Sequence, residues 1–413
     1  MRFPLKSLLL RFTEFDFNPG LLEGIEASGY ETATPVQELV IPAVMAGKDI
    51  IASAQTGTGK TAAFLLPMMH QLLKHQSDGK VGALIIVPTR ELAIQISQHL
   101  EGLSYFTNLS SIAIYGGNDG QNFVAEKKAL QMGADIIVCT PGRMIAHINM
   151  GYSNMKGLQF LVLDEADRML DMGFQDDINR IIQELPAKRQ TLLFSATMPD
   201  KIRQMARQIL QNPLEFNIAI SKPPEKIVQK AFIVYDAQKL SLVKEVLKTT
   251  PYKSALIFCS RKQNVKDLTR ILLQSKFEVA EMHSDLEQSK REEVMNGFIS
   301  GRVPVLIATD ILSRGIDVDT IDLVINYDVP NDGEDYVHRI GRTARAEADG
   351  VAFTFVGEKE QNKFAVIEQL LGKAVEKGVV PESLGPVPNY QPRTRSGGGG
   401  GQGNRRSFHH KKR

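Results

Sequence analysis

The chain has 413 residues, of which 43% are hydrophobic and 23% charged, a composition typical of globular proteins with packed cores. At about 100–200 residues per domain, this length predicts two or three domains. The 49 basic and 47 acidic residues nearly balance, but residues 393–413 include seven basic residues and no acidic one. A mildly acidic body is therefore followed by a basic end.

The cysteines and the apolar segments exclude several classes of protein. Cys139 and Cys259 are the only cysteines and lie 120 positions apart, so no disulfide framework is available. Arg11 interrupts the leucines near the start before they reach the length of a signal peptide. No apolar run approaches the ~18 residues of a membrane span. We expect a cytoplasmic protein with no membrane segment.

Short apolar runs rich in Ile and Val alternate with longer charged stretches of helical periodicity, which is typical of parallel sheets built from βαβ units. The first series of runs occupies residues 49–54, 83–88, 111–116, 135–140, 160–165 and 191–196. The second series occupies residues 231–236, 255–260, 278–283, 305–310, 323–328 and 351–356.

These two series predict an α/β protein with two tandem domains and mostly parallel sheets, over residues 1–217 and 231–375. Prolines and lysines in residues 218–230 predict a linker. Prolines, glycines and basic residues predict a disordered basic tail over residues 376–413. Ligands of open parallel sheets bind beyond the carboxyl ends of the strands, so two facing sheets would form a cleft between the domains.

A glycine-rich loop follows the run at 49–54 and leads into a helical pattern. Its glycines allow backbone N–H groups to surround phosphate oxygens, Lys60 would reach the β- and γ-phosphates, and the Thr61 hydroxyl would ligate Mg²⁺. A glycine turn without function is the alternative. The predicted phosphate-binding residues are Thr56, Gly57, Thr58, Gly59, Lys60 and Thr61.

Two carboxylates, Asp164 and Glu165, end the apolar run at 160–165. Asp164 could hold Mg²⁺, while Glu165 could orient and deprotonate the attacking water. Alone, the Asp-Glu-Ala-Asp segment could be the acidic start of a helix. The upstream phosphate loop favours a phosphoryl-transfer site.

With these motifs the chain resembles the DEAD-box RNA helicases over about residues 12–375, and within them the bacterial RhlE-like group. The resemblance implies two RecA-like domains that bind ATP and Mg²⁺ between them. It further implies, within an adenine-recognition segment at residues 12–37, that Phe12 stacks on adenine and that Gln37 reads the adenine edge. Without the resemblance, Phe12 would be interpreted as a core residue and Gln37 as part of a turn.

The resemblance also places RNA contacts at strand ends in both domains. Hydroxyls, small residues and arginines suit a sugar–phosphate backbone, although each segment alone is an ordinary turn or helix start. The implied RNA-binding residues are Pro88, Thr89, Arg90, Gly117, Thr140, Gly142 and Arg143 in the first domain, and Arg261, Gln288, Arg291 and Thr309 in the second. Ser195 and Thr197 would couple the ATP state to the RNA grip.

In the second domain, the resemblance places Gly315 and Asp317 near the ribose and assigns His338 to coupling. Arg342 and Arg345, three positions apart on one predicted helix face, would act as arginine fingers toward the γ-phosphate. A solvated basic helix face is the alternative.

The predicted function is an RNA helicase that couples ATP hydrolysis in a two-domain cleft to local, non-processive unwinding or remodelling of RNA duplexes or RNA–protein complexes. RNA is the expected partner, bound without sequence specificity, with ribosomal precursors or the RNA-decay machinery as settings. An ATP-gated RNA clamp or annealing chaperone is the alternative, and a P-loop ATPase acting on DNA or protein is a third. The sequence leaves the pathway, the protein partners and the oligomeric state open.

Overall fold

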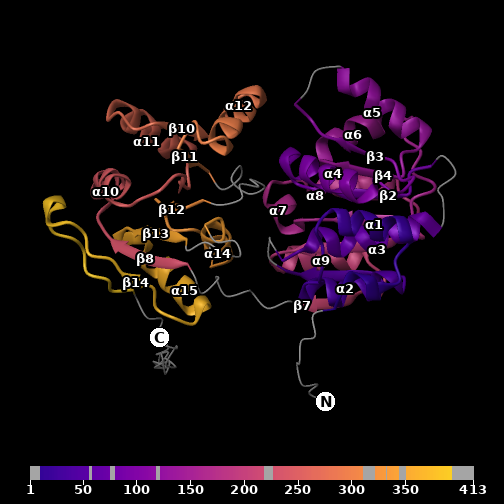
Figure 1. Ribbon diagram of the computed structural model, residues 1–413, viewed down its shortest axis with the longest axis horizontal. Coiled ribbons are helices and arrows are strands. Elements are labelled where there is room, and N and C mark those ends of the chain that lie inside the picture. Colours follow the sequence, from indigo (N-terminus) through magenta and orange to yellow (C-terminus); the bar gives the residue numbers. More distant parts are fainter. Residues whose placement is uncertain are drawn as a thin grey trace, which may run out of the picture.

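The computed structural model describes residues 10–54, 58–74, 80–117, 121–217, 227–309, 321–331, 333–343 and 350–392. These residues form two α/β domains, each built on a seven-stranded sheet (Figure 1). Within these ranges no helix combines the length and the apolar character that crossing a membrane requires.

The sheet of the first domain is parallel throughout, with strand order β3-β4-β2-β5-β6-β1-β7. Every residue of the central strands β2, β4 and β5 is buried, which explains why these strands are continuous apolar runs in the sequence. The strands are β1 (Ile50–Ser53), β2 (Ala83–Ile86), β3 (Ser111–Ile114), β4 (Ile136–Cys139), β5 (Phe160–Leu163), β6 (Gln190–Ser195) and β7 (Leu214–Asn217).

Helices cover both faces of this sheet. Ile85 of β2 packs into a core that includes Phe64 of α3 and Phe194 of β6, whereas its neighbour Leu84 packs into a second core on the opposite face. The helical elements are η1 (Phe12–Phe15), α1 (Pro19–Ala27), α2 (Pro35–Met45), α3 (Lys60–Lys74), α4 (Arg90–Ser104), α5 (Gln121–Met132), α6 (Pro141–Asn149), α7 (Ala166–Asp171), α8 (Gln175–Gln183) and α9 (Asp200–Ile209).

The second sheet is also parallel, with strand order β10-β11-β9-β12-β13-β8-β14. Counted from its own first strand, it repeats the order of the first sheet, so the two domains share one architecture and the predicted fold class is confirmed. The strands are β8 (Val228–Ile233), β9 (Ala255–Phe258), β10 (Val279–Met282), β11 (Val305–Ala308), β12 (Leu323–Asn326), β13 (Val351–Val356) and β14 (Glu376–Lys377).

The helices of the second domain also lie on both faces of its sheet. Leu268 of α11 belongs to one core, and Phe298 of α12 belongs to the core on the other face. The helical elements are α10 (Asp236–Thr249), α11 (Lys262–Gln274), α12 (Gln288–Ile299), α14 (Gly333–Ile340), η2 (Glu358–Glu360), α15 (Gln361–Leu371) and η3 (Glu382–Leu384).

The edges of the second domain differ from the boundaries expected from the sequence. Val228 already pairs with Val351, so β8 begins inside the predicted linker. At the other end, β14 pairs with β8, and the Tyr390 hydroxyl donates to Glu368 Oε2 at 2.5 Å. Residues 376–392 therefore pack on the domain because strand pairing and side-chain hydrogen bonds offset their low hydrophobicity. Residues 218–226 and 393–413 lie outside the described residues.

Candidate functional site

The carboxyl ends of β5, β6 and β1 are neighbours in the first sheet and bring the predicted nucleotide residues together. Lys60 is the first residue of α3, just beyond β1, and Asp164 directly follows β5. The two side chains are close enough for the Lys60 ammonium to lower the pKa of the Asp164 carboxyl. The strand-end arrangement expected from the sequence therefore places them in one site.

The Lys60 ammonium is buried, with 6% of the residue exposed, and its Nζ has no hydrogen-bond partner among the described residues. Burying an unpaired charge is costly, so this position fits an anion that arrives with a ligand. Gly59 has a φ of +91°, a conformation that favours glycine, and Thr61 follows in the first turn of α3. Thr58 is half-buried, and Thr56 and Gly57 lie outside the described residues.

Asp164 is 3% exposed, and burial raises the pKa of its carboxyl to about 6. The nearby Glu165 and Asp167 carboxylates act in the same direction. Two groups lower this pKa: the Lys60 ammonium and the Glu165 backbone N–H, which donates to Asp164 Oδ1 at 2.9 Å. In the ligand-free protein the Asp164 carboxyl therefore binds its proton more tightly than an exposed aspartate does.

Glu165 has the left-handed backbone conformation, with φ of 52° and ψ of 51°. This conformation is uncommon for a residue with a side chain and is often found at functional sites. Its Oε2 accepts a hydrogen bond from Arg168 Nη1 at 2.9 Å, one helical turn later. Arg168 thus orients the carboxylate predicted to activate water, a contact that the sequence analysis missed.

The predicted coupling residues contact the end of the Asp-Glu-Ala-Asp segment directly. Asp167 Oδ2 accepts the Thr197 backbone N–H at 2.8 Å and the Thr197 hydroxyl at 3.0 Å. The Ser195 hydroxyl accepts the Asp167 N–H at 3.3 Å and donates to the Thr197 carbonyl at 2.7 Å. The loops after β5 and β6 are therefore joined through Asp167, which the sequence analysis did not single out.

Gln37 and Phe12, the two predicted adenine contacts, are both packed inside the domain. Gln37 is 1% exposed, and its Nε2 donates to the Gly59 carbonyl at 3.0 Å. Its Oε1 accepts the Thr34 N–H at 2.8 Å. The Phe12 ring is 2% exposed and contacts Tyr30 at 5.8 Å between ring centroids. Adenine recognition by these two residues stays a prediction.

The predicted RNA residues after β2 and β3 lie next to each other. The Arg90 guanidinium lies over the Tyr115 ring at 4.8 Å, and a Cβ added to Gly117 would be 3.3 Å from Arg90 Nη1. Arg90 Nη2 also forms an ion pair with Glu292 Oε1, on α12 of the second domain, at 2.7 Å. Thr89 caps α4 by accepting the Leu92 N–H. Pro88 precedes it and is buried.

Arg143 is half-buried and pairs with residues of its own domain. Its Nε and Nη2 lie 2.8 and 2.7 Å from Glu126 Oε2, and its guanidinium lies over the Phe123 ring at 4.9 Å. Glu126 is 4% exposed and also lies 2.8 Å from Nε2 of the buried His147. These contacts, which the sequence analysis missed, join α5 to α6. The neighbouring Thr140 and Gly142 are at the start of α6.

In the second domain, the predicted RNA residues also follow strands. Arg261 is exposed immediately before α11, and Thr309 follows β11. The Arg291 guanidinium donates to the carbonyls of Leu286 at 3.0 Å and Ser284 at 2.9 Å, so it orders the loop before α12. Gln288 begins α12, but its side chain is outside the described atoms.

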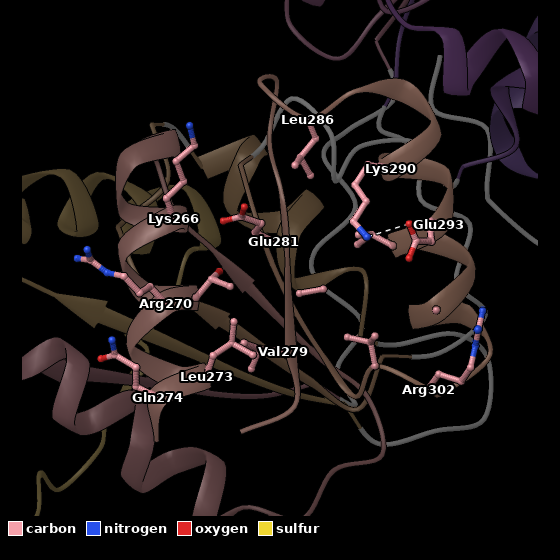
Figure 2. A pocket seen from close by; sticks show the side chains of 15 residues that line it. Lys266, Arg270, Leu273, Gln274, Val279, Glu281, Leu286, Lys290, Glu293 and Arg302 are labelled. Carbon is pink, nitrogen blue, oxygen red and sulfur yellow. Dashed lines mark hydrogen bonds and ion pairs between the residues drawn. The ribbon is translucent and has the colours of Figure 1, made fainter. Parts of the chain in front are cut away.

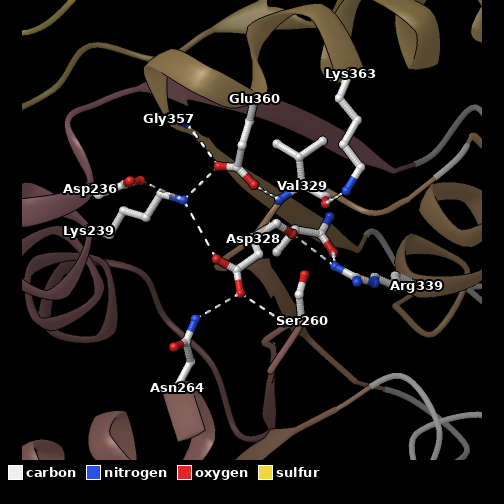
Figure 3. Close-up of polar contacts among 11 residues, drawn as sticks. Asp236, Lys239, Ser260, Asn264, Asp328, Val329, Arg339, Gly357, Glu360 and Lys363 are labelled. Atoms are coloured by element: carbon white, nitrogen blue, oxygen red, sulfur yellow. Dashed lines mark hydrogen bonds and ion pairs between the residues drawn. The ribbon is translucent and has the colours of Figure 1, made fainter. Parts of the chain in front are cut away.

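A buried ionic network supports α14, the helix that carries His338 (Figure 3). Lys239 Nζ lies 2.7 Å from Glu360 Oε2 and 3.7 Å from Asp328 Oδ1. Arg339 of α14 donates to the Asp328 carbonyl at 3.0 Å. This network fixes α14 against the ends of β12 and β13.

Arg342 lies two residues beyond the end of α14 and is half-buried. Three further predicted ATP-site residues, Arg345, Gly315 and Asp317, lie outside the described residues. The described part of the site therefore comprises the phosphate side of the first domain and the helix preceding the predicted arginine fingers.

Comparison with known families and sequences covers both domains. Residues 34–205 match the DEAD/DEAH box helicase family, and residues 238–347 match the helicase conserved C-terminal domain. The chain is 42% identical to the ATP-dependent RNA helicase CshA of Listeria monocytogenes over 369 residues, 89% of this chain and 70% of that protein. It is 39% identical to the ATP-dependent RNA helicase DbpA of Bacillus subtilis over 367 residues, 89% of this chain and 76% of that protein.

Solved structures show the same two-domain arrangement. S. cerevisiae Dbp5 bound to RNA and ADP BeF3 has a TM-score of 0.79 at 32% identity, covering 90% of this chain and 95% of that one. Mss116p bound to ssRNA and AMP-PNP has a TM-score of 0.80 at 27% identity, covering 93% of this chain and 82% of that one.

Proposed function

The chain belongs to the DEAD-box family of ATP-dependent RNA helicases, and we propose that residues at the carboxyl ends of its two sheets together hydrolyse ATP and thereby unwind or remodel RNA locally. The observation that carries the proposal is the buried Lys60 ammonium beside Asp164, for which the described part of the chain offers no hydrogen-bond partner. A ligand phosphate would satisfy Lys60 and would lie next to the predicted catalytic carboxylate Glu165.

The donor set fits Mg²⁺ bound together with ATP. Asp164 and Thr61 would hold the ion, and the phosphates and waters would fill its other positions, as is usual for protein-bound Mg²⁺. When bound, Mg²⁺ supplies positive charge that stabilises the phosphates during transfer. Lys60 binds the phosphate oxygens, while Glu165, oriented by Arg168, accepts a proton from the attacking water.

Arg342 and Arg345 complete the proposed catalytic site from the second domain, where they neutralise charge on the γ-phosphate in the transition state. His338 and the Asp167–Thr197 contact would transmit the nucleotide state to the RNA-binding loops. Because a hydrogen-bonded loop can adopt discrete arrangements, loss of the γ-phosphate could reset the loop after β6.

The RNA side of the proposal uses backbone contacts from both domains, through the loops that contain Arg90, Thr140, Arg261 and Thr309. Such contacts position an RNA strand without reading its bases. The family assignment favours a helicase over an ATP-gated clamp or annealing chaperone. The RhlE-like subgroup, the cytoplasmic location, and a role with ribosomal precursors or RNA decay stay predictions.

ATP turnover with RNA, with DNA of the same sequence, or with neither tests the substrate class. We expect marked stimulation by RNA alone, because only RNA offers the 2′-hydroxyl. A strand-displacement assay on a short RNA duplex then separates unwinding from clamping. Lys60→Ala is the control and should abolish turnover. Equal stimulation by DNA, or RNA-stimulated turnover without strand displacement, would contradict the proposal.

A further inference from the structure

A groove of about 780 Å³ runs along the outer edge of β10, between α11 and α12 (Figure 2). β10 is the terminal strand of the second sheet, and among the described residues it pairs with β11 alone. Because α11 and α12 belong to cores on opposite faces of the sheet, they form two walls with the strand edge between them. An unpaired strand edge offers backbone hydrogen bonds to another chain.

The walls and floor of the groove are largely apolar. Leu273 on α11 is 52% exposed at one wall, and Val294 faces the groove from α12. Val279 and Ala280 of β10 contribute the floor. An exposed apolar surface of this kind is a common feature of binding sites.

Thr269 adds a polar group to the same wall. The residue is 5% exposed, yet its hydroxyl has no hydrogen-bond partner in the part of the chain that the structure describes. A buried hydroxyl without a partner costs free energy that a bound ligand can recover. This observation points to an occupant with hydrogen-bonding groups, such as a peptide backbone.

Basic side chains outnumber acidic ones among the residues that line the groove. Its basic side chains are Lys266, Arg270, Lys290 and Arg302, and its acidic side chains are Glu281 and Glu293. Lys290 pairs with Glu293 at 2.8 Å, Lys266 with Asp285 at 2.8 Å, and Arg270 with Asp267 at 3.0 Å. Because such surface ion pairs contribute little, these cations can exchange partners when an acidic ligand arrives.

We propose that the groove binds an extended segment of a partner protein that contains both acidic and apolar residues, and that this segment adds as a strand to β10. Main-chain hydrogen bonds to the edge give such a strand affinity, and its alternating side chains reach the two walls. The apolar side chains would contact Leu273 and Val294, and the acidic ones the basic side chains of the groove. Charge complementarity disfavours a basic ligand, and the apolar walls disfavour RNA, whose sugar–phosphate backbone offers them no apolar side chain.

The test selects peptides from a phage-displayed library of random twelve-residue sequences on the immobilised full chain. Leu273→Asp serves for counter-selection, because Leu273 is exposed and outside the predicted ATP and RNA residues. We expect the enriched peptides to combine acidic and apolar residues. The best peptide, synthesised with a fluorophore, should bind the wild-type chain measurably by anisotropy.

Leu273→Asp and Arg270→Glu should each lower the affinity for that peptide by about tenfold or more, because the first removes an apolar anchor and the second reverses a basic charge that would pair with the peptide. Val366→Asp is the matched control, since Val366 is 60% exposed on α15, and it should bind as the wild type does. RNA-stimulated ATP turnover should be unchanged in all three variants, which confirms that they fold.

Three results would overturn the proposal. Enriched peptides that lack acidic residues, or that bind Leu273→Asp as tightly as the wild type, would exclude the proposed chemistry. Displacement of the peptide by single-stranded RNA at matched ionic strength would make the groove an RNA site. Self-association of the full chain in sedimentation, abolished by Leu273→Asp, would make a second copy the occupant.

Discussion

Gln37 donates its side-chain amide to the Gly59 carbonyl at 3.0 Å, and this bond ties the first turn of α2 to the loop before α3. The two positions fit closely, since a Cβ added to Gly59 would lie 2.5 Å from Gln37 Nε2. The residue expected to read the nucleotide base therefore also supports the loop expected to hold its phosphates. Changes at Gln37 should affect both functions.

Gln37→Ala should raise the KM for ATP and reduce the preference for ATP over GTP, with a loss of ~1–3 kcal/mol in discrimination. Gln37→Glu keeps an acceptor for the Thr34 N–H but directs a carboxylate at the Gly59 carbonyl, so it should raise the KM at least as much. The measurement is kcat/KM for both nucleotides at saturating RNA. An alanine variant with wild-type KM and nucleotide preference would refute both roles.

Glu165→Gln should keep ATP and RNA binding but lower ATP turnover by ~10²-fold or more, because the attacking water loses its base. Glutamine retains an oxygen that can accept the Arg168 hydrogen bond, so the local structure should persist. Single-turnover hydrolysis and equilibrium binding separate the two effects. Near-normal turnover at saturating RNA would assign the base elsewhere.

The raised pKa of Asp164 makes the stability of the ligand-free protein depend on pH. Its folded-state pKa of about 6 lies above the ordinary value of 3.8, so the folded protein binds this proton more tightly than the unfolded chain does. The resulting stabilisation is present at low pH and is lost as the pH rises through about 6. Asp164→Asn removes this titration.

Thermal midpoints of both proteins, measured without nucleotide between pH 5 and 8, test this prediction. The thermal midpoint of the wild type should fall relative to that of Asp164→Asn as the pH increases through about 6. Parallel curves over the whole range would show that the Asp164 pKa is not raised.

Arg342→Ala should leave ATP affinity within several-fold of the wild type and reduce turnover by ~10³ or more, since an arginine finger acts mainly in the transition state. Arg207→Ala, at an exposed arginine on α9, is the matched control and should behave as the wild type. Equal losses in binding and turnover would instead assign Arg342 to ground-state binding.

The strand-end rule accounts for what could be predicted from the sequence. A buried apolar run ends at or shortly before each of three site residues, Asp164, Thr89 and Ser195. Because the strands are parallel, the sheet gathers these residues at the carboxyl ends of its strands. The same rule places Thr309 at the carboxyl ends of the strands in the second sheet. Periodicity determines their place at the strand ends, whereas the family resemblance implies the roles of Thr89, Ser195 and Thr309 in RNA binding and coupling.

Long-range polar partners could not be predicted in the same way. Glu126 and Arg143 are 17 positions apart on different helices, and no sequence pattern pairs them. Lys239 and Glu360 are 121 positions apart and lie on separate elements. Only the packing of the helices brings these charges together and buries them.

Arg143 provides the sharpest comparison between sequence expectation and structure. Family resemblance implies that it binds an RNA phosphate, whereas the structure shows it paired with the buried Glu126 and stacked on Phe123. Arg261, in contrast, is exposed at the edge of the second sheet. We therefore expect Arg143 to position α6, and Arg261 to contact RNA directly.

The salt dependence of RNA binding distinguishes the two roles. For single strands each neutralised phosphate adds ~0.7 to the slope of log K against log salt concentration. Arg261→Gln should therefore lower the slope by about 0.7, whereas Arg143→Gln should leave it unchanged while lowering the thermal midpoint.

Loss of one partner from a buried ion pair costs about 3–5 kcal/mol, because the other charge stays buried. Glu126→Gln should thus destabilise the protein as Arg143→Gln does. The double variant should lose less stability than the sum of the losses in the two single variants. This non-additivity measures the contact between the two side chains. If Arg143→Gln lowered the salt slope by as much as Arg261→Gln while the protein kept its thermal midpoint, Arg143 would be a phosphate ligand, and its pairing with Glu126 would be a state that RNA displaces.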